Sequence, residues 1–299
     1  GATANPHNIF HTPGGSSSGS AAGVAAGMVG LALGTQTVGS TIRPASYCGV
    51  VGYKPSLARI NKEGLLPFST SADHVGVFTQ DVLGMVLAAS VLCEKWSLSE
   101  SYDDNLPILG IPDGPYIDQA DETIRLGFEA VVTRLGGAGY EIRRISMFDD
   151  INEIQERYRD LISAEFTSVH ADWFVEYGPL YRPKSAMLFS RGQAITEQEL
   201  TIARLGIVPL RMAIEQRMKE AEIDVWICPS TTSIAPEGLS STGDASMNLP
   251  WTYAGLPAVT LPSGMSSDGL PIGTQVVARF MDDEKLLAWC VGMEDVVAP

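Results

Sequence analysis

The sequence predicts an α/β protein built as one large unit. Short apolar runs bounded by Pro and Gly alternate with helix-periodic segments along the whole chain. No internal repeat is present, and no linker-like stretch interrupts the alternation after residue 20. Hydrophobic residues make up 45% and charged residues 18% of the 299 positions, which is the composition of a globular protein. We therefore expect a single domain over residues 1–299 with a large core.

The first predicted element is a helix that follows a glycine- and serine-rich run. Residues 13–20 read PGGSSSGS, which alone is typical of a flexible linker. Residues 21–33 form an apolar run of mostly small side chains, and Ser20 before it is a natural N-cap. A helix that is apolar on nearly all sides is buried. We therefore expect the serine run to be held in place at the start of this helix.

The later elements follow from periodicity and from Pro and Gly boundaries. Residues 34–53 are a second Gly/Ser/Thr segment threaded between apolar pieces. Helical periodicity covers residues 80–93, 121–135, 153–174 and 197–222, and the last two are joined by a predicted loop around residues 178–190. Strand-like runs cover residues 108–111, 140–145, 224–229, 258–261 and 274–278.

Charge and cysteine content exclude several classes of protein. The net charge is −15, and such a field repels phosphate backbones and anionic lipid, so neither nucleic acid nor a membrane is an expected partner. The four cysteines are scattered without a CxxC pair, which favours reduced thiols over a zinc site or disulfides. Residues 1–11 show no signal-peptide pattern, and residues 21–33 are too few to span a bilayer. A soluble, cytoplasmic protein is expected.

One common hydrolase motif is present in the wrong context. Residues 15–19 match G-x-S-x-G, which would make Ser17 the nucleophile. That motif needs a preceding strand, whereas residues 5–14 contain two prolines and no apolar run. It also needs a late histidine, and the last histidine here is His170. Serine chemistry can use lysine as its base instead.

Residues 11–56 strongly resemble the amidase signature family. They carry, in order, a Gly-Gly-Ser-Ser entry, a small-residue helix, a Gly-Thr-x-Thr-x-Gly-Ser turn, Arg-Pro-Ala, Cys-Gly and Gly-x-Lys-Pro-Ser. Weaker matches at residues 71–76 and 224–278 extend the resemblance over essentially the whole chain. The resemblance implies a mixed central β-sheet covered by helices on both faces. It also implies a Ser–Ser–Lys amide hydrolase that needs no metal and no organic cofactor.

The resemblance assigns roles to individual residues. Ser40 occupies the position of the acyl-forming nucleophile. Ser16, 24 positions earlier, corresponds to the bridging serine that follows a cis peptide and relays the proton. The backbone N–H groups of Thr37, Val38, Gly39 and Ser40 correspond to the oxyanion hole. Glycine at position 39 suits a tight turn whose amides converge on the developing negative charge.

Arg43 and Ser18 are the candidate substrate-binding residues. Arg43 lies three positions after Ser40, in a Ser-x-Ile-Arg-Pro variant that resembles malonamidase-like members, where the matching arginine contacts a substrate carboxylate. The alternative is that Arg43 ties down the loop through backbone carbonyls. Gln36 stands where aspartate is more usual in the family.

Structural roles are expected for three residues that could be mistaken for catalytic ones: Lys54, Cys48 and His74. Acidic residues such as Glu165 and Asp224 are expected on solvated faces. Trp251 and Tyr253 either line an acyl pocket or, as we favour, belong to an aromatic core.

The family's catalytic lysine has no counterpart in these residues. All six lysines lie at or beyond Lys54, whereas the family's base lies upstream of Ser40. An upstream piece outside residues 1–299 supplies it, another group stands in, or the chain lacks amidase activity. A missing first segment would uncover an apolar face, so we expect poor solubility or homo-oligomers.

Three functions are compatible with these residues. The first is an amidase that hydrolyses the C–N bond of a small carboxamide through an acyl-enzyme on Ser40. The second is a catalytically impaired amidase fold that acts as a binding or assembly module. The third is the amidotransferase component that works on charged tRNA, which the −15 charge and the Ser-x-Ile-Arg-Pro pattern disfavour.

Overall fold

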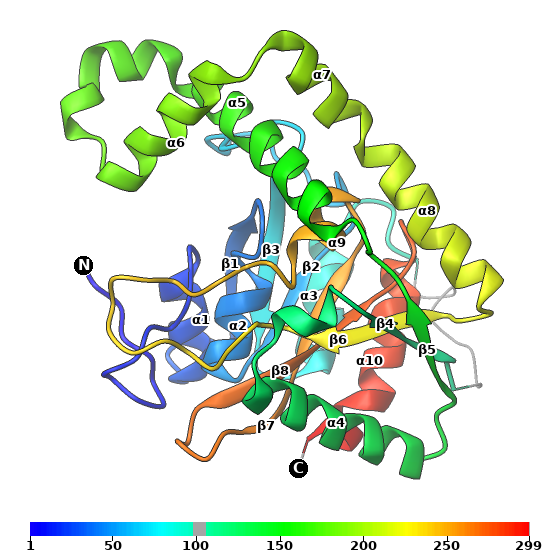
Figure 1. The fold of residues 1–299 in the computed structure, drawn as a ribbon. Helices are drawn as coiled ribbons and strands as arrows, with labels where there is room; N and C mark the ends of the chain where they lie inside the picture. The colour runs from blue at the N-terminus through cyan, green and yellow to red at the C-terminus, as the bar shows by residue number, and fades with distance from the viewer. Residues whose placement is uncertain (98–105, 299) are drawn as a thin grey trace.

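The computed structural model describes residues 1–97 and 106–298. Within these residues a mixed sheet of eight strands has the order β1-β3-β2-β7-β8-β6-β4-β5 (Figure 1). Strand β4 runs parallel to β5 and β6, and the other neighbouring pairs are antiparallel. The strands are β1 (Leu31–Gln36), β2 (Val51–Lys54), β3 (His74–Thr79), β4 (Leu109–Asp113), β5 (Ile142–Ser146), β6 (Val225–Pro229), β7 (Ala258–Met265) and β8 (Pro271–Val277).

Helices lie between most of these strands, as the α/β prediction requires (Figure 1). Two short 3-10 turns, η2 (Ile117–Gln119) and η3 (Gly178–Leu180), accompany them. The α-helices of the described residues are α1 (Ser18–Ala25), α2 (Ile42–Cys48), α3 (Val82–Leu92), α4 (Glu122–Gly137), α5 (Ile151–Tyr177), α6 (Pro183–Ala194), α7 (Glu197–Leu205), α8 (Ile207–Glu220), α9 (Leu249–Tyr253) and α10 (Asp283–Val297).

Both faces of the sheet are covered, which confirms the predicted architecture. A Cβ added at Gly273 of β8 would lie 2.6 Å from the Ser46 hydroxyl of α2. The next residue along the strand, Ile272, lies against Gly127 of α4, where an added Cβ would be 3.1 Å from it. Adjacent strand residues point to opposite faces, so α2 and α4 cover opposite sides. Helix α10 packs against β7, α3 and α4.

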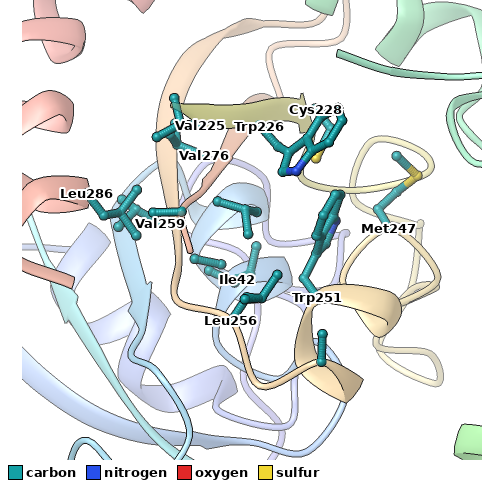
Figure 2. Packing of buried hydrophobic residues seen from close by; sticks show 14 of the residues in the cluster. Ile42, Val225, Trp226, Cys228, Met247, Trp251, Leu256, Val259, Val276 and Leu286 are labelled. Atoms are coloured by element: carbon teal, nitrogen blue, oxygen red, sulfur yellow. The ribbon is translucent and has the colours of Figure 1, made fainter. Parts of the chain in front are cut away.

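The core continues through the sheet on both sides. Figure 2 shows Leu286 of α10 beside Val259 and Val276 on one side, with Trp251 and Met247 on the other. Trp251 is fully buried, and its indole N–H donates to the Tyr116 hydroxyl at 2.7 Å. Tyr253 is also buried. The prediction of an aromatic core for these tryptophan and tyrosine residues is therefore confirmed.

The prediction of one helix over residues 21–33 is wrong in its second half. Helix α1 ends at Ala25, Gly27 has a φ of 67°, and the apolar run continues as β1, which pairs antiparallel with β3. A short apolar run does not distinguish a buried helix from a strand, and pairing with β3 decides it. The helix begins at Ser18. The hydroxyls of Ser17 and Ser20 bond instead to backbone groups of β1.

Two further helix predictions need correction. The predicted loop at residues 178–190 contains η3 and most of α6, which begins at Pro183 because proline is accommodated at the first helical position. The helix predicted over residues 197–222 is divided at Gly206 into α7 and α8. At Gly206 an added Cβ would lie 2.3 Å from the Tyr253 hydroxyl, so glycine permits this close approach. The other predicted helices and strands are found, with ends shifted by a few residues.

Candidate active site

Two glycines lead into Ser16. Gly14 has a φ of 79°, and an added Cβ there would lie 2.8 Å from the Cα of Pro44, so glycine is required. The Gly15–Ser16 peptide bond is cis, as the resemblance implied. Ser16 is exposed, and its hydroxyl has no hydrogen-bond partner within the described residues. Its side chain is therefore free to meet a ligand.

Ser40 lies in the turn between β1 and α2, next to the Ser16 segment. The backbone N–H of Ser17 donates to the Ser40 carbonyl at 3.4 Å, which joins the two serine-bearing segments. Ser40 is half-buried, and its hydroxyl also lacks a partner among residues 1–97 and 106–298. The fold thus brings together the two serines that the sequence singled out.

The side chain of Gln36 holds the turn that carries Ser40. Its side-chain oxygen accepts hydrogen bonds from the backbone N–H groups of Thr41 at 2.8 Å and Ile42 at 3.0 Å. Its amide N–H donates to the Thr252 hydroxyl at 2.9 Å, and that hydroxyl lies 2.7 Å from the Val38 carbonyl. Gln36 and Thr252 are both buried, so these bonds are shielded from water. A neutral amide at position 36 therefore serves as acceptor and donor at once.

Thr37, in the same turn, is held by hydrogen bonds with Asp73 and Tyr158. Its hydroxyl donates to an Asp73 carboxylate oxygen at 2.6 Å, and its carbonyl accepts a hydrogen bond from the Tyr158 hydroxyl. Asp73 belongs to the Ser71–Gly76 block that carried part of the resemblance, whereas Tyr158 lies inside α5 without a motif around it. Sequence reasoning missed Tyr158 for this reason.

The turn at residues 38–40 packs closely against Ala245 and Asn248. An added Cβ at Gly39 would lie 2.3 Å from the Asn248 side-chain oxygen, so the turn approaches Asn248 closely only with glycine. No hydrogen bond within the described residues uses the N–H groups of Val38, Gly39 or Ser40. Unpaired amides beside a free hydroxyl can stabilise a negatively charged oxygen.

Arg43 binds the protein itself. Its guanidinium donates to the Gly15 carbonyl at 2.6 Å, the Gly243 carbonyl at 2.8 Å and the Thr242 hydroxyl at 3.2 Å. The residue is buried, and burial lowers the pKa of Arg43 below its usual range. These contacts match the alternative in which Arg43 ties down the loop. It links the carbonyl just before Ser16 to residues 242–243.

Ser18 likewise has its hydroxyl engaged within the protein. The hydroxyl donates to the Gly14 carbonyl at 2.7 Å and so closes the turn around Gly15 and Ser16.

Lys54 and His74 lie in the sheet, as structural roles require. The ammonium group of Lys54 is fully buried and donates to the carbonyls of Leu256 at 2.5 Å and Pro55 at 3.0 Å. The imidazole Nδ1 of His74 lies 2.7 Å from the Ala72 carbonyl. Burial, followed by the charge of Lys54, holds the pKa of His74 well below its usual value.

Replacing Lys54 with methionine is expected to remove part of the pH dependence of folding stability. Burial lowers the pKa of Lys54 from 10.5 to about 7, against the opposing effect of Asp283. Above pH 7 Lys54 therefore binds more protons in the unfolded chain than in the folded chain, and its contribution to the free energy of unfolding rises with pH. The slope is at most about 1.4 kcal/mol per pH unit.

Urea unfolding between pH 7 and about 9 measures this slope. Lys54→Met should flatten it, whereas Lys219→Met, at an exposed lysine of α8, should leave it unchanged. Equal slopes in wild type and Lys54→Met would contradict the prediction.

The expectation of a solvated face is wrong for Glu165 and only partly met for Asp224, whereas other acidic residues such as Glu153 are exposed. Glu165 is buried and accepts hydrogen bonds from Ser69, Ser71 and Arg204. Asp224 is half-buried and accepts the backbone N–H of Ile108 at 2.9 Å, which fixes the start of β4. Both carboxylates therefore join separate segments of the chain. Cys48 is a buried free thiol, as expected.

The described residues show neither a metal cluster nor a membrane span. Among residues 1–97 and 106–298 no group of three or more His, Cys, Asp or Glu side chains could hold a metal ion. In the same residues no helix has both the length and the apolar character that crossing a membrane needs.

Comparison with known proteins defines the class. A family model described as Amidase matches residues 1–287. The A subunit of glutamyl-tRNA(Gln) amidotransferase from Sulfurimonas denitrificans is 29% identical over 98% of this chain and 74% of its own length. The protein of the same name from Prochlorococcus marinus is 31% identical over 96% of this chain and 68% of its own length. The chain therefore belongs to the amidase family.

Solved structures agree with this membership. A crystal structure of an amidase has a TM-score of 0.88 and 28% identity, covering 98% of this chain and 68% of that one. A 6-aminohexanoate cyclic dimer hydrolase shares the fold, with a TM-score of 0.83 and 23% identity over 99% of this chain and 70% of that one. At the level of the family, the chemistry is hydrolysis of an amide C–N bond.

Proposed function

We propose that the protein hydrolyses a small carboxamide through an acyl-enzyme on Ser40. The observation that carries this proposal is the junction of the two serine segments. The Ser17 N–H donates to the Ser40 carbonyl. Within the described residues, the hydroxyls of Ser16 and Ser40 have no hydrogen-bond partner, and the N–H groups of residues 38–40 are unpaired. A nucleophile next to unpaired amide donors is the arrangement that acyl transfer needs.

Each bond change has an assigned group. The Ser40 oxygen attacks the amide carbonyl carbon, and its proton passes through the Ser16 hydroxyl to a general base. The amides of Thr37, Val38, Gly39 and Ser40 stabilise the negative charge on the substrate oxygen. The base returns the proton to the leaving nitrogen, the C–N bond breaks, and ammonia or an amine departs. Water then cleaves the ester on Ser40 and releases the acid.

In this proposal the general base is a lysine, which the resemblance places before Ser40 and which residues 1–39 do not contain. None of the six lysines precedes Lys54, and the ammonium of Lys54 is committed to two backbone carbonyls in the core. In this scheme Arg43 and Ser18 shape the Ser16 loop, because their polar groups already bond the backbone of Gly14 and Gly15. The mechanism needs no metal and no organic cofactor.

Covalent labelling with a fluorophosphonate tests the nucleophile. Mass mapping should find the label on the peptide that contains Ser40, and Ser40→Ala should abolish it. Ser17→Ala is the matched control, because Ser17 lies in the G-x-S-x-G match yet bonds the β1 backbone. Labelling that survives Ser40→Ala would refute the assignment. Absence of labelling in the full-length gene product would favour a binding module instead.

The substrate class is a small molecule in the cytoplasm. Relatives are named for glutamyl-tRNA(Gln), but a net charge of −15 opposes docking of a polyanion. The four cysteines are all free and buried, which suits a reducing compartment.

Self-association is expected through an apolar groove between β1 and α3. The groove has a volume of about 450 Å³, and Leu33, Leu87 and Val91 are exposed on its walls. Residues 1–299 on their own leave this surface exposed, and a second copy of the same residues can bury it. Sedimentation velocity should show concentration-dependent association that Leu87→Glu weakens. Leu126→Glu, at an exposed leucine of α4, should have no effect. A monodisperse monomer at every concentration would contradict this expectation.

A further inference from the structure

A small pocket opens beside the turn that carries Ser40. It is lined by Thr35 and Thr37 on one side and by side chains between Lys62 and Thr70 on the other. Its volume of about 170 Å³ would hold roughly six water molecules at about 30 Å³ each. A ligand portion of about six non-hydrogen atoms therefore fits.

The pocket is attached to both serine segments. The backbone N–H of Thr35 donates to the Ser17 hydroxyl at 3.2 Å, which places this wall next to the Ser16 segment. Thr37 immediately precedes the unpaired amides of residues 38–40. A substrate whose carbonyl lies at Ser40 can therefore extend one end into this pocket.

The opposite wall is held rigidly against the turn. The Asp73 carboxylate accepts the Thr37 hydroxyl at 2.6 Å and the backbone N–H groups of Phe68 and Ser69 at 2.7 and 2.9 Å. The Phe68 ring packs on Phe166 with centroids 4.8 Å apart. Three donors satisfy Asp73, so its charge is committed to the turn and the wall.

Lys62 is the cation that remains available to a ligand. Of the described residues that line the pocket, Lys62 alone has a cationic side chain. Its ammonium donates one hydrogen bond, to the Thr70 carbonyl at 3.1 Å, and forms no ion pair within the described residues. An ammonium group has three donors. Arg43, the cation that the sequence favoured for a carboxylate, has its terminal nitrogens bonded to the protein.

We propose that this pocket takes the end of the substrate that bears a carboxylate, and that Lys62 pairs with it. The substrate class is an amide with a short aliphatic chain ending in a carboxylate, where Leu65, Pro67 and Phe68 contact the chain. The carboxylate can belong to the acyl part or to the leaving amine, and these two sources share the same recognition. This inference rests on Ser40 as the site of reaction.

The test measures binding without turnover, on the Ser40→Ala chain. Succinamate carries the carboxylate on the acyl side and N-acetyl-β-alanine carries it on the amine side. Butyramide and N-propylacetamide are their neutral counterparts. Calorimetric dissociation constants should favour at least one anionic ligand over its neutral partner by about tenfold, the value of one charge-assisted hydrogen bond.

Variants at Lys62 assign this preference. Lys62→Met should remove the tenfold preference and leave neutral ligands unchanged, whereas Lys62→Arg should retain it. Lys219→Met is the matched control on an exposed helix face. Thermal unfolding of each variant verifies that the fold is kept. Equal or absent binding of anionic and neutral ligands, or a loss of both in Lys62→Met, would overturn the proposal.

Labelling and binding together distinguish a failure of the Lys62 pocket from a failure of Ser40 as the nucleophile. Fluorophosphonate labelling of Ser40 with no carboxylate preference refutes the Lys62 pocket alone. A carboxylate preference that depends on Lys62, in a protein whose Ser40 is never labelled, refutes the hydrolytic role alone.

Discussion

Replacing Ser40 with alanine is expected to lower kcat/KM toward amides by about 10⁴-fold or more. The Ser40 oxygen forms the covalent bond in the proposed reaction, so no other group can replace it. Ser16→Ala is expected to cost at least about 10²-fold, the range of one general acid–base step. The assay uses the full-length gene product and follows release of ammonia.

The double variant discriminates between a relay and two independent contributions. If Ser16 acts only through Ser40, then Ser16→Ala with Ser40→Ala should be no slower than Ser40→Ala alone, because residues that act as a unit are not additive. The Ser17 N–H donates to the Ser40 carbonyl at 3.4 Å, so the Ser16 segment lies next to the turn that carries Ser40. Losses that multiply in the double variant would show that Ser16 contributes by another route.

The turn and its serines were predictable because a local motif encodes them. Gly39 is required where Asn248 approaches within contact distance, and Gly14 is required for a positive φ against Pro44. Because only glycine meets these backbone requirements, glycine stands at fixed positions relative to the serines, and this spacing can be recognised in the sequence. The strand and helix alternation was predictable for a similar reason, since periodicity reports which face is buried.

The partners of long side chains could not be predicted. Arg43 bonds Gly243, which lies 200 positions away in a loop without any motif. Whether its guanidinium meets a substrate or a carbonyl depends on that distant loop, so both interpretations fitted the sequence. The prediction of a single helix over residues 21–33 failed for a related reason. The second half of this run forms β1 because it pairs with β3, beginning at Leu31 and Thr79, and that partner is distant in the sequence.

The burial of the charged residue Glu165 could not be predicted from the sequence either. Helix α5 carries many acidic and basic residues, and their spacing is typical of an exposed face. The side chain nevertheless points to the loop that contains Ser69 and Ser71, and only 1% of Glu165 is exposed. No pattern in α5 marks Glu165 as different from an exposed acidic residue of the same helix such as Glu153.

Replacing Glu165 with alanine is therefore expected to lower the free energy of unfolding by about 3 kcal/mol. Ser69 and Ser71 would lose a buried acceptor, and the half-exposed Arg204 would lose its partner, which moderates the cost. Glu153→Ala, at an exposed position of the same helix, should change it by less than about 0.5 kcal/mol. Urea unfolding at neutral pH compares the two variants.

The pH dependence of this difference follows from the same contacts. Burial by itself would raise the pKa of Glu165, but hydrogen bonds from Ser69 and Ser71, with Arg204, hold it below 4.5. A carboxylate with a lowered pKa stabilises the fold above pH 4.5, and this stabilisation is lost as pH falls through the folded-state pKa. The gap between wild type and Glu165→Ala should therefore narrow in acid. A gap that stays constant would mean that packing, and not the charge of Glu165, is lost.

Glu165→Ala should also reach the active site, because its loop continues into Asp73. Ser69 donates to both Glu165 and Asp73, and Asp73 holds the Thr37 hydroxyl beside the unpaired amides. Loosening this loop should displace the pocket wall that contains Ser69 and Asp73, whereas Ser40, just before α2, should keep its position. For any substrate that uses the Lys62 pocket, KM should therefore rise more than kcat falls. An unchanged KM in a folded but less stable variant would show that Glu165 serves the fold alone.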